Sequence, residues 1–271
     1  MSAPTTSVRE HRAPLTAAPR SIDVRNPAGS VTVRADEHAP EVVVRLTALD
    51  RAAEEVLDRV QVVATGSALR VAVPQRRLGR SPEVAVEVLT PPGAEVAVTA
   101  GSASVTLEGR LGAGVVTAAS GAVAVERCAG LQVRSAGGDV RLGSVAGAAT
   151  VATASGDVRI GSAAGPVQVR TASGDVTVGD AATDVRVSTA SGEVVIGRAR
   201  AGTVQLKTVS AGASVAVEPG LRVWLDVQSV SGRLDLQLQD DTTGPDGAAD
   251  LRVLVSSVSG DVRLRRAARE G

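Results

Sequence analysis

The chain has 271 residues, of which 44% are hydrophobic, yet it contains no Phe, no Tyr and a single Trp. Any core must therefore be thin and filled by small aliphatic side chains. Its 29 basic and 29 acidic residues cancel, and without a basic stripe or stacking aromatics we expect no nucleic-acid partner. A single cysteine excludes an internal disulfide.

Residues 1–20 are rich in Pro, Ala, Thr and charged side chains and show no periodic pattern. This composition is typical of a disordered leader. The segment holds no apolar stretch like that of a secretory signal, and no run in the chain approaches the roughly 20 apolar residues that span a bilayer. We therefore expect a cytoplasmic protein without a membrane span.

Residues 21–98 are expected to form a β-rich module that carries one short helix. Runs of alternating apolar residues, such as residues 42–46, predict strands. Between two of these runs, residues 49–60 have apolar side chains at the spacing of one helical face, and Thr47 or Asp50 can open the helix. The apolar face of the expected helix consists of Ala53, Val56, Leu57 and Val60.

Residues 99–266 are dominated by an internal repeat, and self-similarity at a fixed period indicates a stacked architecture. The clearest copies follow one another at intervals of 18 residues. They are Ser135-Ala-Gly-Gly-Asp139, Thr153-Ala-Ser-Gly-Asp157, Thr171-Ala-Ser-Gly-Asp175 and Thr189-Ala-Ser-Gly-Glu193. Looser copies surround Gly121, Gly212, Gly232 and Gly260.

Each unit holds two apolar pairs separated by two turns, for example Val158 with Ile160 and Val167 with Val169. Because strand residues alternate between faces, these pairs should point inward while Arg170 points outward. An antiparallel meander could use the same units. A solenoid is favoured because it stacks identical positions about 4.8 Å apart, which explains why the whole unit recurs.

The predicted fold is therefore an all-β parallel β-solenoid, or β-helix, of roughly 18-residue coils capped by the N-terminal module. Residues 239–249 are expected to form a loop insertion and residues 267–271 a charged tail. The glycine at each corner is expected to supply a positive φ angle, which other residues reach only with strain.

The residues resemble a bacterial family of unknown function labelled "putative adhesin". The resemblance covers about residues 21–266 and rests on Asn26-Pro-Ala-Gly-Ser-Val31 and on the corner serines. These serines are Ser155, Ser173, Ser191, Ser231 and Ser259. The resemblance implies a link to the cell envelope in many relatives, and it implies no agreed activity, cofactor or catalytic residue.

One candidate site is a column of carboxylates that the solenoid would stack at successive corners. Its members are Asp139, Asp157, Asp175 and Glu193. Such a column could bind Ca²⁺, which takes several oxygen ligands. However, the 18-residue spacing differs from the Ca²⁺-binding nonapeptide repeat, and Arg141 and Arg159 stand two residues after their Asp. We therefore expect turn-forming carboxylates and no metal ion.

Residues that perform nucleophilic chemistry are nearly absent. The only histidines are His11 in the leader and His38 in an expected loop, so Cys128 has no evident basic partner and should be a buried thiol. A polysaccharide-cleaving β-helix would need aromatic platforms for sugars. Trp224 alternates with aliphatic residues along the chain. We expect its side chain to form a lid over the solenoid edge, in preference to a contact with a partner.

The sequence thus predicts a non-catalytic scaffold or self-associating structural protein with no catalytic, cofactor-binding or metal-binding residues. The alternative is a module that presents a repetitive surface to a protein or an envelope component, and a polysaccharide-active enzyme is disfavoured. Because the last copy would end the solenoid with unpaired backbone groups, we expect a weak homodimer through residues 251–264.

Overall fold

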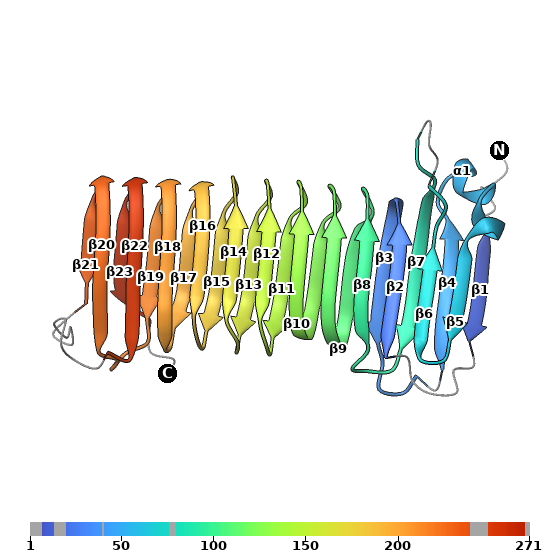
Figure 1. The fold of residues 1–271 in the computed structure, drawn as a ribbon, viewed down its shortest axis with the longest axis horizontal. Helices are drawn as coiled ribbons and strands as arrows, with labels where there is room; N and C mark the ends of the chain where they lie inside the picture. Colours follow the sequence, from blue (N-terminus) through green and yellow to red (C-terminus); the bar gives the residue numbers. More distant parts are fainter. Residues whose placement is uncertain (1–6, 14–19, 40, 76–79, 239–248, 269–271) are drawn as a thin grey trace. The chain divides into compact units, whose positions relative to one another are not determined.

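The computed structural model describes residues 7–13, 20–39, 41–75, 80–238 and 249–268 (Figure 1). Strands make up most of these residues, and the chain divides into two compact units, Met1–Gly138 and Asp139–Gly271. This division differs from the boundary near residue 98 that the sequence suggested. The parallel ladders of the first unit run through that position, because β3 (Ala28–Ala35) pairs with β9 (Ser104–Ala118).

The second unit is a parallel β-solenoid in which each coil contributes one strand to each of two ladders. Partners in the regular part lie 18 residues apart, as for Val158 with Val176 and Val167 with Val185. One ladder contains β11 (Val140–Val145), β13 (Val158–Ala163), β15 (Val176–Ala181), β17 (Val194–Ala199) and β19 (Ala213–Val217). The other contains β12 (Ala149–Thr153), β14 (Val167–Thr171), β16 (Val185–Ser191) and β18 (Gly202–Ser210). These parallel registers confirm the solenoid and exclude the antiparallel meander.

The strand phase predicted from the sequence is confirmed. Val158, Ile160, Val167 and Val169 are all buried, whereas Arg170 is exposed. The core therefore consists of stacked Val, Ile, Leu and Ala side chains from both ladders, and no aromatic ring is required to fill it.

The last coils do not stack in chain order. β22 (Leu251–Ser259) pairs with β18 on one side and with β20 (Val223–Ser231) on the other. Likewise, β23 (Val262–Arg266) lies between β19 and β21 (Leu234–Gln237). The expectation that residues 251–264 form the open end is therefore wrong, and the described coil at that end is β20 with β21.

The physical reason for this error lies in the repeat itself. Both copies have the same inward apolar pattern, with Val253 and Val255 in β22 matching Leu225 and Val227 in β20. Periodicity identifies each copy as a coil, but it does not fix the order in which equivalent coils stack. The expected loop insertion, residues 239–249, connects these copies, and all of it except Ala249 lies outside the described residues.

The first unit combines parallel coils with antiparallel strands. β2 (Ser21–Asn26) pairs in parallel with β6 (Ala68–Ala72) and β8 (Glu95–Ala100), and β9 pairs in parallel with β10 (Val123–Ser135). β4 (Val42–Ala48) runs antiparallel to β7 (Glu83–Thr90), and β5 (Gln61–Thr65) runs antiparallel to β6. The expected β-rich module is thus present, and its strands continue directly into the coils that follow.

The helix expected over residues 49–60 is shorter and broken. It consists of α1 (Arg51–Glu54), capped by the Asp50 carboxylate, and a separate 3₁₀ turn at Leu57–Arg59. The reason is visible in the backbone, where the N–H groups of Val56, Arg59 and Val60 bond to carbonyls three residues earlier, which tightens the chain into 3₁₀ geometry. The predicted apolar face is nevertheless buried, at 6% exposure or less.

The prediction that residues 1–20 form a disordered leader is also wrong in part. Residues 8–13 form β1 (Val8–Ala13), which pairs antiparallel with β4, while residues 1–6 and 14–19 lie outside the described residues. β1 is held by backbone pairing with β4, and Val8, Arg9 and Glu10 are exposed, so the strand needs no apolar period. No buried side-chain pattern therefore revealed this strand in the sequence.

Candidate functional site

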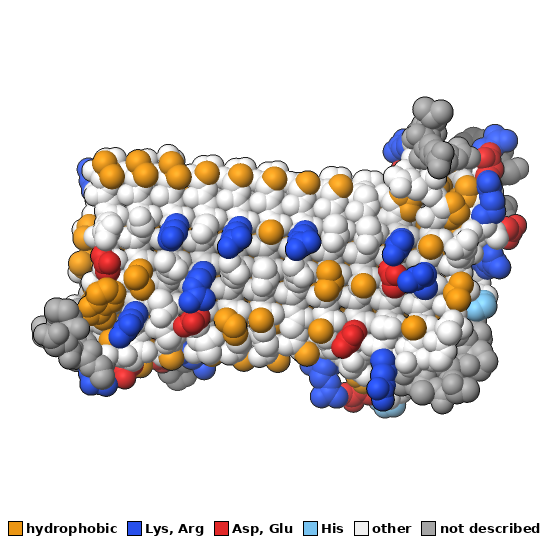
Figure 2. All heavy atoms as spheres, viewed as in Figure 1, with side chains coloured by type: hydrophobic (Ala, Val, Ile, Leu, Met, Phe, Trp, Pro, Cys, Tyr) orange, Lys and Arg blue, Asp and Glu red, His pale blue; other side chains and the backbone are white. Residues whose placement is uncertain are grey.

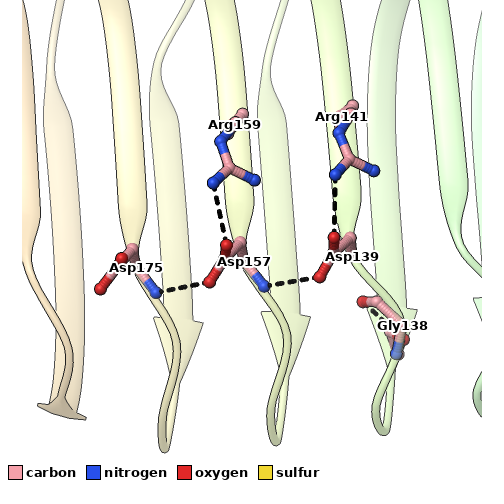
Figure 3. A network of polar contacts seen from close by, with 7 residues as sticks. Gly138, Asp139, Arg141, Asp157, Arg159 and Asp175 are labelled. Carbon is pink, nitrogen blue, oxygen red and sulfur yellow. Dashed lines mark hydrogen bonds and ion pairs between the residues drawn. The ribbon is translucent and has the colours of Figure 1, made fainter.

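The carboxylate column is present and each member bonds to the next coil. Oδ1 of Asp139 accepts a hydrogen bond from the backbone N–H of Asp157 at 3.1 Å, and Asp157 accepts from Asp175 at 3.0 Å (Figure 3). The same bond links Asp175 to the N–H of Glu193 at 2.8 Å. The carboxylates therefore secure the stacking of successive corners. The sequence predicted bonds within each turn, and these bonds run instead to the next coil.

The second oxygen of these carboxylates faces an arginine. Arg141 donates to Asp139 and Arg159 donates to Asp157, both at 2.9 Å (Figure 3). The N–H of Asp175, followed by the Arg159 guanidinium, holds the pKa of Asp157 below its ordinary value. Among the described residues, no group of three or more His, Cys, Asp or Glu side chains has the geometry of a metal site. The column thus has a structural use for both oxygens of Asp139 and Asp157.

The positive φ predicted for the corner glycines is confirmed at Gly156, Gly174, Gly192, Gly232 and Gly260, and is wrong at Gly121, Gly138 and Gly212. Gly174 has φ +110°, and a Cβ atom there would collide with the carbonyl oxygen of Gly156 in the coil below. Gly156 itself has φ +105°. At Gly174, both the backbone conformation and the close approach of the neighbouring coil therefore require glycine.

Gly212 interrupts the carboxylate column. The registers place it between Glu193 and Asp261, and these two carboxylates line a surface hollow of about 750 Å³ together with Arg233 and Arg263. Asp261 accepts a hydrogen bond from the N–H of Arg233 at 2.9 Å. Asp261 therefore secures the terminal coil through this bond.

The histidines and the cysteine do not form a catalytic group. His11 lies on β1 opposite Val44, and the exposed His38 lies beside Asp36 at 3.5 Å. Cys128 is buried, as expected, and burial raises the pKa of its thiol to about 11. A thiol with a raised pKa is a poor nucleophile, because the thiolate is the reactive form.

The terminal coil exposes apolar side chains that inner coils bury. Leu234 is 49% exposed and Leu236 is 47% exposed, whereas their partners Val262 and Leu264 in β23 are 1% and 0% exposed. Val230, at the corner between β20 and β21, is 82% exposed. Sequence reasoning placed the open end at a different copy, so these residues were missed, and no signal in the repeat distinguishes them.

Trp224 lies on the terminal strand β20, beside Arg252 of β22, and is partly exposed. It belongs to the outward side chains of that strand, on the face that the sequence predicted. The side chain lies on an outer face and leaves the apolar end of the core open, so the expected lid stays a prediction.

The comparison with family models gives one decisive match. The model of the family described as Toastrack DUF4097 matches residues 20–265. This chain belongs to the Toastrack DUF4097 family. The β-solenoid seen in both units of this Toastrack chain is therefore the fold of a family whose function is unknown. No curated protein matches the chain.

Several solved structures resemble this Toastrack chain at low identity. A "putative adhesin" from Bacteroides fragilis is 13% identical, with a TM-score of 0.48 over 96% of this chain and 98% of that chain. A "putative adhesin" from Parabacteroides merdae is 11% identical, with a TM-score of 0.47 over 96% and 97%. A "putative lipid binding protein" from Parabacteroides distasonis is 14% identical, with a TM-score of 0.42 over 94% and 97%. At these values the likenesses carry no argument about function.

Proposed function

We propose that this Toastrack chain is a non-catalytic scaffold that self-associates through its terminal coil, β20 and β21. The observation that carries the proposal is the open core at this coil, where Leu234 and Leu236 are about half exposed. Burial of such side chains against a second copy stabilises an interface, because apolar area is removed from water. We thus still propose a homodimer, as the sequence predicted, but we place its interface at residues 223–237 and not at residues 251–264.

The backbone of β20 supports pairing with another strand. The carbonyl of Arg222 accepts from the N–H of Leu251, so Arg222 and alternate residues after it face β22. Residues such as Leu225 and Val227 then direct their backbone groups away from β22. Within the described part of the chain, β20 has no ladder on that side. An uncovered strand edge of this kind is a template for pairing with another chain.

A two-fold antiparallel pairing of β20 with its copy has a natural centre. Val227 is the midpoint of Val223–Ser231, so pairing about it uses the full strand. Asp226 then lies opposite Gln228 of the second copy, and Trp224 lies opposite the exposed Val230. Asp226 and Gln228 can form a hydrogen bond, and Trp224 and Val230 can form an apolar contact. Because both copies use the same surface, the assembly closes as a dimer.

The non-catalytic part of the proposal rests on how the candidate residues are used. Asp157 and Asp261 accept backbone N–H groups of neighbouring coils, and Cys128 is buried. No helix in the described part of the chain is long and apolar enough to cross a membrane. The cytoplasmic location expected from the sequence stays a prediction.

The register gives a direct test by disulfide cross-linking. Residues 224 and 230 of opposite copies would form a non-hydrogen-bonded pair, whose Cα atoms lie roughly 4.5 Å apart and can be bridged by a disulfide. We expect the double variant Trp224→Cys and Val230→Cys to give a covalent dimer under mild oxidation, detected on a non-reducing gel. Each single variant provides the control, because it lacks the partner thiol at the opposite position.

Sedimentation velocity across concentration provides the second measurement. Val230→Lys should weaken the dimer, because it places two cations at the interface, whereas Val63→Lys changes a half-exposed valine of β5 and should not. A protein that stays monomeric at every concentration would contradict the proposal. So would a dimer that is equally sensitive to both lysines.

A further inference from the structure

One face of the second unit carries an excess of positive charge. The outward side chains of five adjacent strands, β12, β14, β16, β18 and β22, include four cations and no carboxylate. Figure 2 shows the basic side chains spread over these strands. The cations are Arg170, Arg186, Lys207 and Arg252. We name this surface the basic face.

The cations of the basic face are poorly neutralised by the chain itself. Among the described residues, Arg170 and Lys207 form no ion pair, and Arg186 approaches only Asp184, at 3.8 Å. Elsewhere in the same unit, Arg159 and Arg222 pair closely with Asp157 and Asp250. A chain with no net charge has thus concentrated unpaired positive charge on one face.

The three central cations surround a shallow hollow of about 140 Å³. The register sets Gln168, Arg186 and Gln205 side by side in one row, and Arg170, Ser188 and Lys207 in the next. Neighbouring strands are about 4.8 Å apart, so the cations of the second row are roughly 10 Å apart. This is a flat array of separated charges with hydrogen-bonding groups between them, and it suits an extended anionic surface more than one small anion.

An exposed apolar ridge borders the basic face. It occupies the corner residue that follows the last inward Thr or Ser of each coil, and Figure 2 shows it as a row of hydrophobic side chains along one edge. In stacking order it consists of Ala154, Ala172, Ala190, Val209, Val258 and Val230. The valines are each at least 50% exposed. The ridge runs two residues beyond Arg170 and Lys207, so cations and apolar groups form parallel rows.

We infer that the basic face and its ridge bind the surface of a membrane that contains anionic lipids. Rows of Lys and Arg are attracted to anionic headgroups, and an adjoining apolar row can enter the interface between headgroups and acyl chains. Trp224, on the neighbouring strand, is the residue type that favours this interface. A binding site for single-stranded nucleic acid or for neutral sugars would instead need several aromatic side chains for stacking. The inference does not depend on the proposed dimer.

Vesicle co-sedimentation tests the inference with the full chain. We expect binding to vesicles of phosphatidylglycerol mixed with phosphatidylcholine and none to phosphatidylcholine alone, with affinity falling as salt is raised. The double variant Arg170→Gln and Lys207→Gln should lose about tenfold or more in affinity. The matched control, Arg233→Gln and Arg265→Gln, removes the same charge outside the basic face and should bind as the original chain does.

A ridge variant separates a lipid surface from a soluble polyanion. Val209→Ser with Val258→Ser keeps every charge and should weaken vesicle binding, most visibly at high salt, where the apolar contribution remains. Thermal melting of each variant confirms that it is folded. The inference is overturned if anionic vesicles do not bind, or if the face and control variants lose equal affinity. It is also overturned if dextran sulfate binds as tightly as vesicles and the ridge variant is unaffected.

Discussion

The inner coil formed by β22 and β23 and the terminal coil formed by β20 and β21 carry nearly the same inward pattern. Leu264 in β23 and Leu236 in β21 are direct ladder partners, yet the first is 0% and the second 47% exposed. The difference arises because β23 has a coil on both sides, whereas β21 pairs on one side among the described residues. In a solenoid, burial therefore depends on neighbours and not on strand sequence alone.

The largest expected effect is the difference in unfolding free energy between a charge introduced at Leu264 and one introduced at Leu236. Leu264→Asp buries an unpaired carboxylate and should cost about 4 kcal/mol or more of unfolding free energy. At a protein concentration low enough for the monomer to predominate, Leu236→Asp leaves the carboxylate near water and should cost about 1 kcal/mol or less. Denaturant titration of both variants gives the two values. Equal losses would mean that the order of the terminal coils is wrong.

Much of this architecture follows from the sequence because the solenoid repeats its signals. The inward positions, such as Val158 and Val169, and the positive φ of corner glycines such as Gly174, were predicted correctly. Both of these features are local, so the chain itself determines them. The carboxylates were predicted to bond within their own turns, whereas Asp139, Asp157 and Asp175 bond to the backbone of the next coil.

The features that were missed depend on contacts between distant segments. β1 forms because it pairs with β4, which lies far from it in the sequence. β18 pairs with β22 and not with β20, although the two copies have the same inward pattern. The basic face appears only when the outward residues of strands 18 or more positions apart lie side by side. None of these has a periodic signature.

A smaller loss of stability is expected when a corner glycine is replaced by alanine. The loss should depend on whether the neighbouring coil lies close to that glycine. Gly174→Ala forces a side chain into a positive φ and against the carbonyl of Gly156, and should cost about 1–3 kcal/mol. Gly212 is the matched control, since a Cβ there would meet only the Asp261 carbonyl oxygen at 3.8 Å. Gly212→Ala should change the free energy of unfolding by less than about 0.5 kcal/mol. Similar costs at the two positions would show that the coils approach each other less closely than the structure indicates.

The smallest effect concerns acid, and it compares a carboxylate that joins two inner coils with one that binds the terminal coil. Bonds from the Asp175 N–H and from Arg159 lower the pKa of Asp157, and bonds from Arg222 lower the pKa of Asp250. A lowered pKa in the folded state means that the ionised carboxylate stabilises folding above the ordinary pKa of 3.8, and that this stabilisation is lost as the pH falls below that value.

We therefore expect the melting temperature to fall between about pH 5 and pH 3, and to fall less steeply in Asp157→Asn than in the original chain. An asparagine oxygen still accepts the Asp175 N–H, so this variant removes the titrating charge while retaining the bond between coils. Asp250→Asn makes the same change just before β22, where the carboxylate binds Arg222 at the start of the terminal coil. This carboxylate is more exposed to water, and its pairing with Arg222 is weakened by salt. Added salt should therefore reduce the acid effect more at Asp250 than at Asp157. An acid dependence that neither substitution alters would mean that other carboxylates determine it, and that the bonds along the column contribute to geometry more than to stability.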